Sequence, residues 1–106
     1  MVKRLSLVRR LPQLSREEFA ERWLGEHVDV ARRLPGLQGY TVDIVEAGAA
    51  PFDGIAAVRF ASRGEADAAF AVPELVDSLR RTRDDFASSV EIVWVQENVV
   101  VPYRGG

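Results

Sequence analysis

The chain has 106 residues, of which 47% are hydrophobic and 28% charged, and its formal net charge is −2. This size and composition fit a single globular domain over residues 1–106 and exclude both a disordered chain and two independent cores. The absence of cysteine excludes disulfides, thiolate zinc sites, iron–sulfur clusters and cysteine nucleophiles.

The charge distribution bears on location and partners. Basic residues are interleaved with acidic ones over the chain as a whole, so the basic stripe typical of a nucleic-acid-binding protein is missing. Arg9 and Arg10 interrupt the N-terminal segment before any apolar run reaches the length of a signal peptide or a membrane span. We therefore expect a cytoplasmic protein with no nucleic-acid or membrane partner.

The first expected strand covers residues 3–10. Leu5 and Leu7 alternate there with polar residues, as in a strand with one buried face. Pro12 ends the strand, because proline cannot donate a backbone hydrogen bond.

A helix then begins with two signals together. Ser15 and Glu18 have the spacing of a capping box, and Leu14 and Phe19 stand at the two positions of a hydrophobic staple. The helix should end near residue 34, because the Pro-Gly pair at residues 35–36 removes a donor and allows a left-handed turn.

The second half of the chain predicts two strands, a helix interrupted near Pro73, and a closing strand. Their expected ranges are 37–46, 55–61, 63–87 and 91–101. The apolar residues from Ile92 to Val95 are contiguous, which predicts a closing strand with both faces buried. Residues 103–106 are expected to form a flexible tail.

The resulting order β-α-β-β-α-β predicts an α+β, ferredoxin-like fold, with an antiparallel sheet and the helices on one face. Two helices can cover only one side of such a sheet, and an apolar face left in water would make the protein poorly soluble. We therefore expect a homodimer in which a second copy covers the other face. Apolar residues considered for that face are Leu5, Leu7, Ile55, Phe60, Ile92 and Trp94.

The only histidine of the chain, His27, falls on the apolar side of the first helix. At about 100° per residue, it lies near the middle of one apolar arc. That arc contains Phe19, Ala20, Trp23, Leu24, Val30, Ala31 and Leu34. His27 is then either a core residue that donates to a backbone carbonyl or a tyrosine, or a general acid or base that lines a cavity with Tyr40 as its partner.

Other chemistries find little support. One histidine and scattered carboxylates give no convergent ligand set for a metal ion. His27 could ligate haem, but no other feature favours haem. The sequence has neither a glycine-rich phosphate loop nor a recognisable Ser-His-Asp arrangement. We expect neither a metal nor a cofactor.

The segment from Ser15 to Tyr40 resembles the EthD family of dimeric α/β-barrel proteins. In that family a Phe, a Trp and a His recur at four-residue steps and precede a Leu-Pro-Gly-Leu element and a Tyr. The matching residues here are Phe19, Trp23, His27, Leu34, Pro35, Gly36, Leu37 and Tyr40. A looser similarity continues through Asp53 to Phe60, Asp85-Phe86 and the closing strand.

The resemblance implies a homodimer whose two sheets pack face to face as a dimeric α/β barrel, and a pocket lined by His27 and Tyr40. Members of the family are linked to ether degradation, lactone isomerisation and polyketide tailoring, so the resemblance implies no particular substrate. Some catalytic relatives place a second histidine in the pocket, which this sequence lacks.

We predict a homodimer that binds a small hydrophobic cyclic or aromatic metabolite and acts as a cofactor-independent isomerase, lyase or dehydratase. His27 would transfer a proton, and Tyr40 would donate a hydrogen bond to a carbonyl or enolate. The expected substrate contacts are Phe19, Trp23, Phe60 and Trp94. The alternative is a non-catalytic dimer that binds a metabolite or supports a partner enzyme in a catabolic or biosynthetic pathway.

Overall fold

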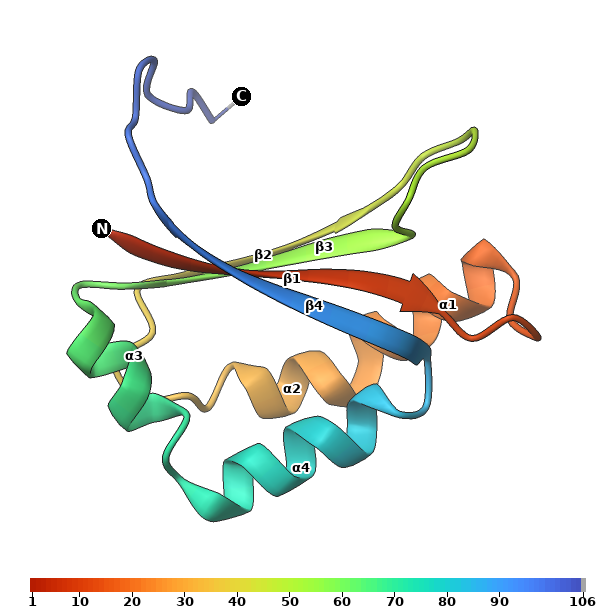
Figure 1. Ribbon diagram of the computed structural model, residues 1–106, viewed down its shortest axis with the longest axis horizontal. Helices are drawn as coiled ribbons and strands as arrows, with labels where there is room; N and C mark the ends of the chain where they lie inside the picture. Colours follow the sequence, from red (N-terminus) through yellow and green to blue (C-terminus); the bar gives the residue numbers. More distant parts are fainter. Residues whose placement is uncertain (106) are drawn as a thin grey trace.

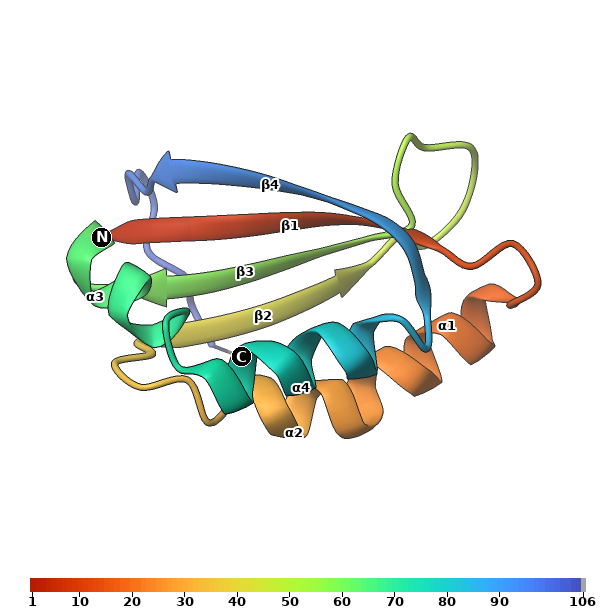
Figure 2. The ribbon, with the colours of Figure 1, turned by 60° about the horizontal axis from the view of Figure 1, so that its bottom comes forward.

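The computed structural model describes residues 1–105 and consists of one antiparallel sheet with every helix on the same face (Figure 1). The strands are β1 (Val2–Arg10), β2 (Gly39–Ile44), β3 (Gly54–Phe60) and β4 (Ala87–Gln96), in the spatial order β2-β3-β1-β4 (Figure 2). The helices are α1 (Arg16–Arg22), η1 (Trp23–His27), α2 (Val28–Ala31), α3 (Arg63–Ala69) and α4 (Pro73–Arg83). This is the ferredoxin-like arrangement that the order of elements predicts.

Helix α1 begins as the sequence predicts. Ser15 Oγ accepts from the Glu18 backbone N–H at 3.1 Å, and Glu18 Oε1 accepts from the Ser15 N–H at 3.0 Å, so both halves of the capping box are present. Leu14 and Phe19 are both buried in one core cluster, as a hydrophobic staple requires. The turn after the helical segment contains Gly36 with a positive φ of 76°, which confirms the predicted left-handed turn.

The helix does not continue as a straight α-helix. Residues 23–27 form the π-helical turn η1, and Gly25 has φ −90° and ψ −116°, outside the helical range. A π turn holds one more residue than an α turn, so the buried arc is recentred beyond it. Val28 is therefore buried, whereas Leu24, at the edge of the expected arc, is 54% exposed. The prediction for Leu24 was wrong for this reason.

The register of the sheet decides which side chains of β1 face the helices. Arg4, Ser6 and Val8 lie opposite Val58, Ala56 and Gly54 of β3, and face the helices together with them. Leu5 and Leu7 consequently point to the uncovered face. Of the six apolar residues considered for that face, Leu5, Leu7 and Ile55 lie on it, and Phe60, Ile92 and Trp94 face the helices.

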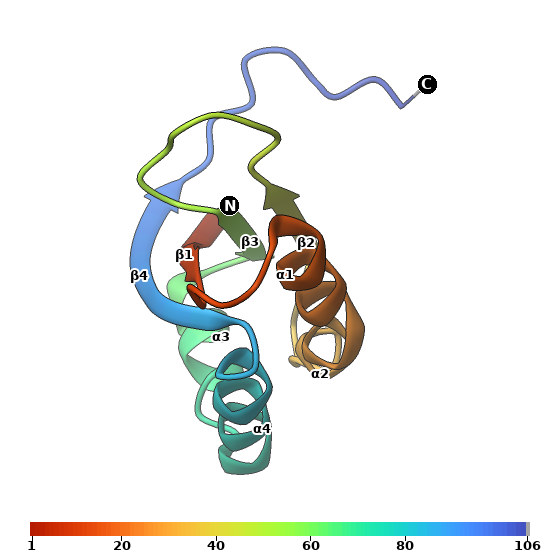
Figure 3. The same cartoon turned by 90° about the vertical axis from the view of Figure 1, so that its right-hand side faces the viewer.

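The closing strand differs from its prediction. β4 spans Ala87–Gln96 at one edge of the sheet, and Ile92 and Val93 are each 40% exposed, so its two faces are not buried within the chain. The segment that follows leaves the sheet on the side opposite the helices (Figure 3). Its exposed apolar residues are Val99, Val100, Val101 and Tyr103. Gly106, the end of the expected tail, lies outside the described residues.

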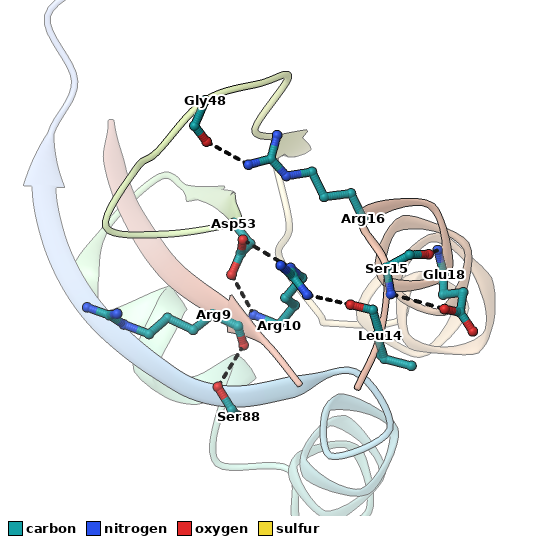
Figure 4. Close-up of polar contacts among 9 residues, drawn as sticks. All are labelled: Arg9, Arg10, Leu14, Ser15, Arg16, Glu18, Gly48, Asp53 and Ser88. Atoms are coloured by element: carbon teal, nitrogen blue, oxygen red, sulfur yellow. Dashed lines mark hydrogen bonds and ion pairs between the residues drawn. The ribbon is translucent and has the colours of Figure 1, made fainter. Parts of the chain in front are cut away.

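The loop between β2 and β3 is fastened to the start of α1 (Figure 4). The Asp53 carboxylate accepts from the Arg10 backbone N–H at 2.9 Å and lies 3.4 Å from Arg10 Nε. Arg16 donates to the Gly48 carbonyl at 2.7 Å. These contacts fix the chain immediately before β3, and therefore fix the position of Gly54. Within residues 1–105, no helix combines the length and apolar character needed to span a membrane.

Candidate functional site

A cavity of about 200 Å³ lies between the sheet and the helices. All four strands contribute to its wall, as do η1, α2 and α4, so it lies between the two layers of the fold, and the exposed Arg80 side chain marks where it opens to solvent. Most of the lining residues are apolar and a few are polar or charged. This combination is typical of pockets for small organic molecules. The polar and charged lining residues are Arg4, Ser6, Trp23, His27, Tyr40, Arg80 and Arg83.

His27 is held in one orientation by α4. Its Nδ1 lies 2.7 Å from Thr82 Oγ1, and that hydroxyl donates its own proton to the Ser78 carbonyl at 2.8 Å. Because the Thr82 proton is already used, its oxygen must accept from His27 Nδ1–H. The neutral imidazole therefore carries its proton on Nδ1, and Nε2 is left as the basic nitrogen.

The surroundings of His27 favour the neutral ring. Burial, together with the positive charge of Arg83, lowers the pKa of His27 from 6.5 to about 4, and a backbone hydrogen bond at Leu79 opposes this in part. The ring also contacts the edge of Phe86, with centroids 5.2 Å apart. At neutral pH the imidazole is thus an uncharged acceptor of protons.

Trp23 forms a second part of the cavity wall and is 1% exposed. Its ring stacks on Phe86 with centroids 5.2 Å apart and an interplanar angle of 17°. The Cζ3 edge rests on Gly54, where an added Cβ would lie 2.4 Å from Cζ3. Only glycine leaves room for the indole at this position. At the other end of the ring system, Nε1–H has no hydrogen-bond partner within residues 1–105.

Tyr40 of β2 lies beside Trp23 in the cavity wall. Burial raises the pKa of the Tyr40 phenol, while the nearby Trp23 N–H and Arg32 lower it in part. The indole and the phenol are close but do not have hydrogen-bond geometry, because Trp23 Nε1 remains unpartnered. The Tyr40 phenol is therefore protonated at neutral pH and can donate a hydrogen bond from the cavity wall, whereas the indole N–H lies buried beside it.

The structure brings together three of the six side chains predicted for the site, namely His27, Tyr40 and Trp23. The other three do not line the cavity. Phe19 packs behind Trp23, with centroids 5.4 Å apart, and Phe60 is fully buried in a separate core cluster. Trp94 lies beneath the Arg63 guanidinium at 3.8 Å.

Sequence reasoning missed Thr82, Phe86, Arg4 and Arg83. Thr82 could have been found, because it stands three residues after Leu79 and four before Phe86, which makes it a polar residue on the apolar stripe of α4. No signal marked the arginines, since strand and helix arginines usually face solvent. Within residues 1–105, no group of three or more potential metal-binding side chains comes together.

Comparison with known proteins places this geometry in a family. The EthD domain matches residues 11–89. No sequence among curated proteins matches the chain. The chain is similar in structure to an EthD family protein of Bacillus halodurans, with 20% identity, a TM-score of 0.77 and coverage of 92% of this chain and 99% of that one.

Two further solved structures are informative. A dimeric ferredoxin-like protein from Thermobifida fusca has 14% identity, a TM-score of 0.69 and coverage of 89% of this chain and 88% of that one. The hydroxynitrile lyase of Passiflora edulis has 13% identity, a TM-score of 0.72 and coverage of 95% and 96%. At such identities the likeness shows the fold alone. Because the EthD domain covers most of the sequence, the chain belongs to the EthD family.

Proposed function

We propose that the cavity binds a small hydrophobic cyclic or aromatic metabolite and that His27 removes a proton from it, in a cofactor-independent isomerase, lyase or dehydratase. The observation that carries this proposal is the fixed tautomer of His27. Thr82 occupies Nδ1, burial keeps the ring neutral, and the basic Nε2 belongs to a side chain that lines the cavity. This is the arrangement that a general base needs.

The chemistry follows from the neighbours of the base. Nε2 takes a proton from a carbon next to a carbonyl, and the electrons of the C–H bond move onto the carbonyl oxygen to give an enolate. The Tyr40 O–H is the donor in the cavity wall that would stabilise that oxygen. Return of the proton to another carbon isomerises the substrate, and loss of a β leaving group gives a lyase or dehydratase.

Hydrogen–deuterium exchange tests the base directly, without knowledge of the full reaction. The protein is incubated in D₂O with a panel of cyclic ketones, lactones and aromatic ketones, and loss of each C–H signal is followed by NMR. We expect accelerated exchange next to the carbonyl of at least one compound. His27→Gln should lower that acceleration by roughly 10²-fold or more, because general-base catalysis contributes about this much.

Two control variants sharpen the result. Tyr40→Phe should slow exchange less than His27→Gln, because it removes a hydrogen bond to the enolate oxygen and leaves the base in place. Ser88→Ala changes an exposed residue outside the cavity and should leave the rate unaltered. If no compound exchanges faster than in buffer, or if His27→Gln exchanges as fast as the unmodified chain, the proposed base is refuted.

The alternative function is non-catalytic binding in the same cavity. The pKa of about 4 favours it, because an imidazole with so low a pKa is a weak base at neutral pH. A binding protein would show ligand-induced NMR shifts at cavity residues without any accelerated exchange. The same panel of compounds therefore separates the two functions.

We further propose that the chain is a homodimer that uses the outer face of its sheet. All helices lie on one face of the sheet (Figure 1). By the strand register, apolar side chains of β1, β3 and β4 remain on the other face. Val93 of that face is 40% exposed, and Leu5 is its partner on β1. The dimeric relative from Thermobifida fusca supports a second copy as the cover.

Light scattering coupled to gel filtration tests the dimer. We expect twice the mass of the chain, 2 × 11.8 kDa, for the unmodified protein. Val93→Glu places a charge on the outer face and should give monomers. Glu91→Lys, on the same face of the same strand, controls for a change of charge alone. A monomer for the unmodified chain would refute the proposal.

A further inference from the structure

The charges around the cavity all have one sign. Its lining includes Arg4 from β1 and Arg80 and Arg83 from α4, and no aspartate or glutamate. Arg80 is paired at the surface with Asp77 at 2.9 Å. Arg83 has only Asp84 nearby, at 3.9 Å, and within residues 1–105 Arg4 has no carboxylate at ion-pair distance. Two guanidinium groups thus face the cavity without compensation from inside it.

The position of Arg4 strengthens this observation. It alternates with Leu5 on β1 so that its side chain extends toward the helices, where the guanidinium lies 4.2 Å from the centroid of the Phe70 ring. Burial lowers the pKa of Arg4, and the charge of Arg83 lowers it further, so the Arg4 charge is held where solvent screens it poorly and close enough to Arg83 to be repelled by it. An anion between them would relieve this repulsion.

We propose that the ligand of this cavity is a small organic carboxylate, whose charged group binds Arg4 and Arg83 and whose ring packs against Trp23 and Phe86. The inference rests on the proposed function, because it specifies the ligand of the same cavity. A volume of about 200 Å³ is below the roughly 300–1,000 Å³ typical of pockets for drug-sized ligands, which favours a single ring.

A carboxylate would also act on His27. The titratable and charged groups that surround the cavity with His27 are Arg80 and Arg83 on α4, Arg4 on β1 and Tyr40 on β2. Because the positive charge of Arg83 helps to hold the pKa of His27 low, a bound anion would raise it and make the imidazole a stronger base. The charge of the ligand would thereby determine how basic His27 is.

Matched pairs of ligands test the inference on the unmodified chain. Benzoate, phenylacetate and cyclohexenecarboxylate are each compared with the corresponding neutral amide by calorimetry and by NMR shifts at cavity residues. We expect at least one carboxylate to bind roughly tenfold or more tightly than its amide, as expected for a charge-assisted contact. The same carboxylate should raise the pKa of His27, and its amide should not.

Substitutions locate the anion site. Arg4→Met and Arg83→Met should each weaken carboxylate binding by roughly tenfold and weaken amide binding less, because an amide has no charge for the guanidinium to pair with. Arg81→Met, on the exposed side of α4 and outside the cavity, should change neither. The ligand comparison needs no variant, so a variant that fails to fold does not remove the test.

The outcomes separate this inference from the proposed function. If amides bind in the cavity as tightly as carboxylates, the carboxylate inference is overturned while a binding cavity stands. If carboxylates bind better but the two arginine variants bind them normally, the proposed anion site is overturned. If a carboxylate binds as expected but His27→Gln does not affect hydrogen exchange, the proposal that His27 is a general base is refuted, whereas the proposal that the ligand is a carboxylate is supported.

Discussion

The buried neutral His27 makes stability depend on pH in a window that can be worked out. Its pKa is about 4 in the folded chain and 6.5 as the unperturbed value. Between these values the unfolded state binds the proton and the folded state does not, so the free energy of unfolding falls as the pH drops. The contribution of His27 is complete above pH 6.5 and is lost progressively toward pH 4.

The size of the effect follows from the shift. The difference of 2.5 between 6.5 and 4 corresponds to about 3 kcal/mol over the whole window. Between about pH 7.5 and pH 5, the unfolded state takes up nearly one proton and the folded state about a tenth of one. The expected loss over that interval is about 2 kcal/mol.

Urea unfolding measures this loss. The free energy of unfolding is determined at the two pH values for the unmodified chain and for His27→Gln, which cannot titrate. Carboxylates titrate in both proteins, so the difference between the two pH dependences isolates the histidine. We expect the unmodified chain to lose about 2 kcal/mol more than the variant. Equal losses in both proteins would refute the buried, neutral assignment.

Two further variants test the walls of the cavity. Gly54→Ala places a Cβ 2.4 Å from Cζ3 of Trp23 and should lower the free energy of unfolding, measured in urea, by about 1–3 kcal/mol. The control Gly64→Ala, in an open helical position, should be neutral or slightly stabilising. Equal effects of the two variants would contradict the close packing of Trp23 on Gly54. Thr82→Val removes the acceptor for Nδ1–H of His27, so it should lower the free energy of unfolding by about 1–3 kcal/mol and alter the imidazole ¹⁵N chemical shifts. Unchanged shifts would show that the tautomer does not depend on Thr82.

The fold could be predicted from sequence because its signals are local. The capping box at Ser15, the left-handed turn at Gly36 and the interruption at Pro73 depend on the backbone chemistry of a few adjacent residues. The order of elements then limits the topology to few choices. The prediction that both faces of the closing strand are buried within the chain was wrong. A run of apolar residues indicates that the side chains are buried, but it does not indicate whether the same chain or a second chain buries them.

The site was predictable only in part. His27 and Trp23 were found because they lie on the apolar side of a helix, and Tyr40 because it stands near the start of the strand that follows this helix. Arg4 was not predicted, because the alternation of Leu5 and Leu7 with polar residues suggested that the leucines face the core and that Arg4 faces solvent. Those leucines face the uncovered side, and the polar residues between them face the cavity. The alternation of apolar and polar residues in β1 shows that the strand has two different faces, but it does not show which face packs against the helices.

The π turn η1 affects the backbone around His27 but does not change which residues of the helical segment pack in the core. It holds one extra residue, so Phe19 before it, Trp23 at its first position, and Val28 and Ala31 after it are all buried. Shortening the segment by one residue at Gly25 would give an ordinary α-helix with the same residues toward the sheet. Only the wide turn beside the imidazole would be lost. Deletion of Gly25 is therefore expected to change the local backbone around His27 without requiring a second mutation in the core.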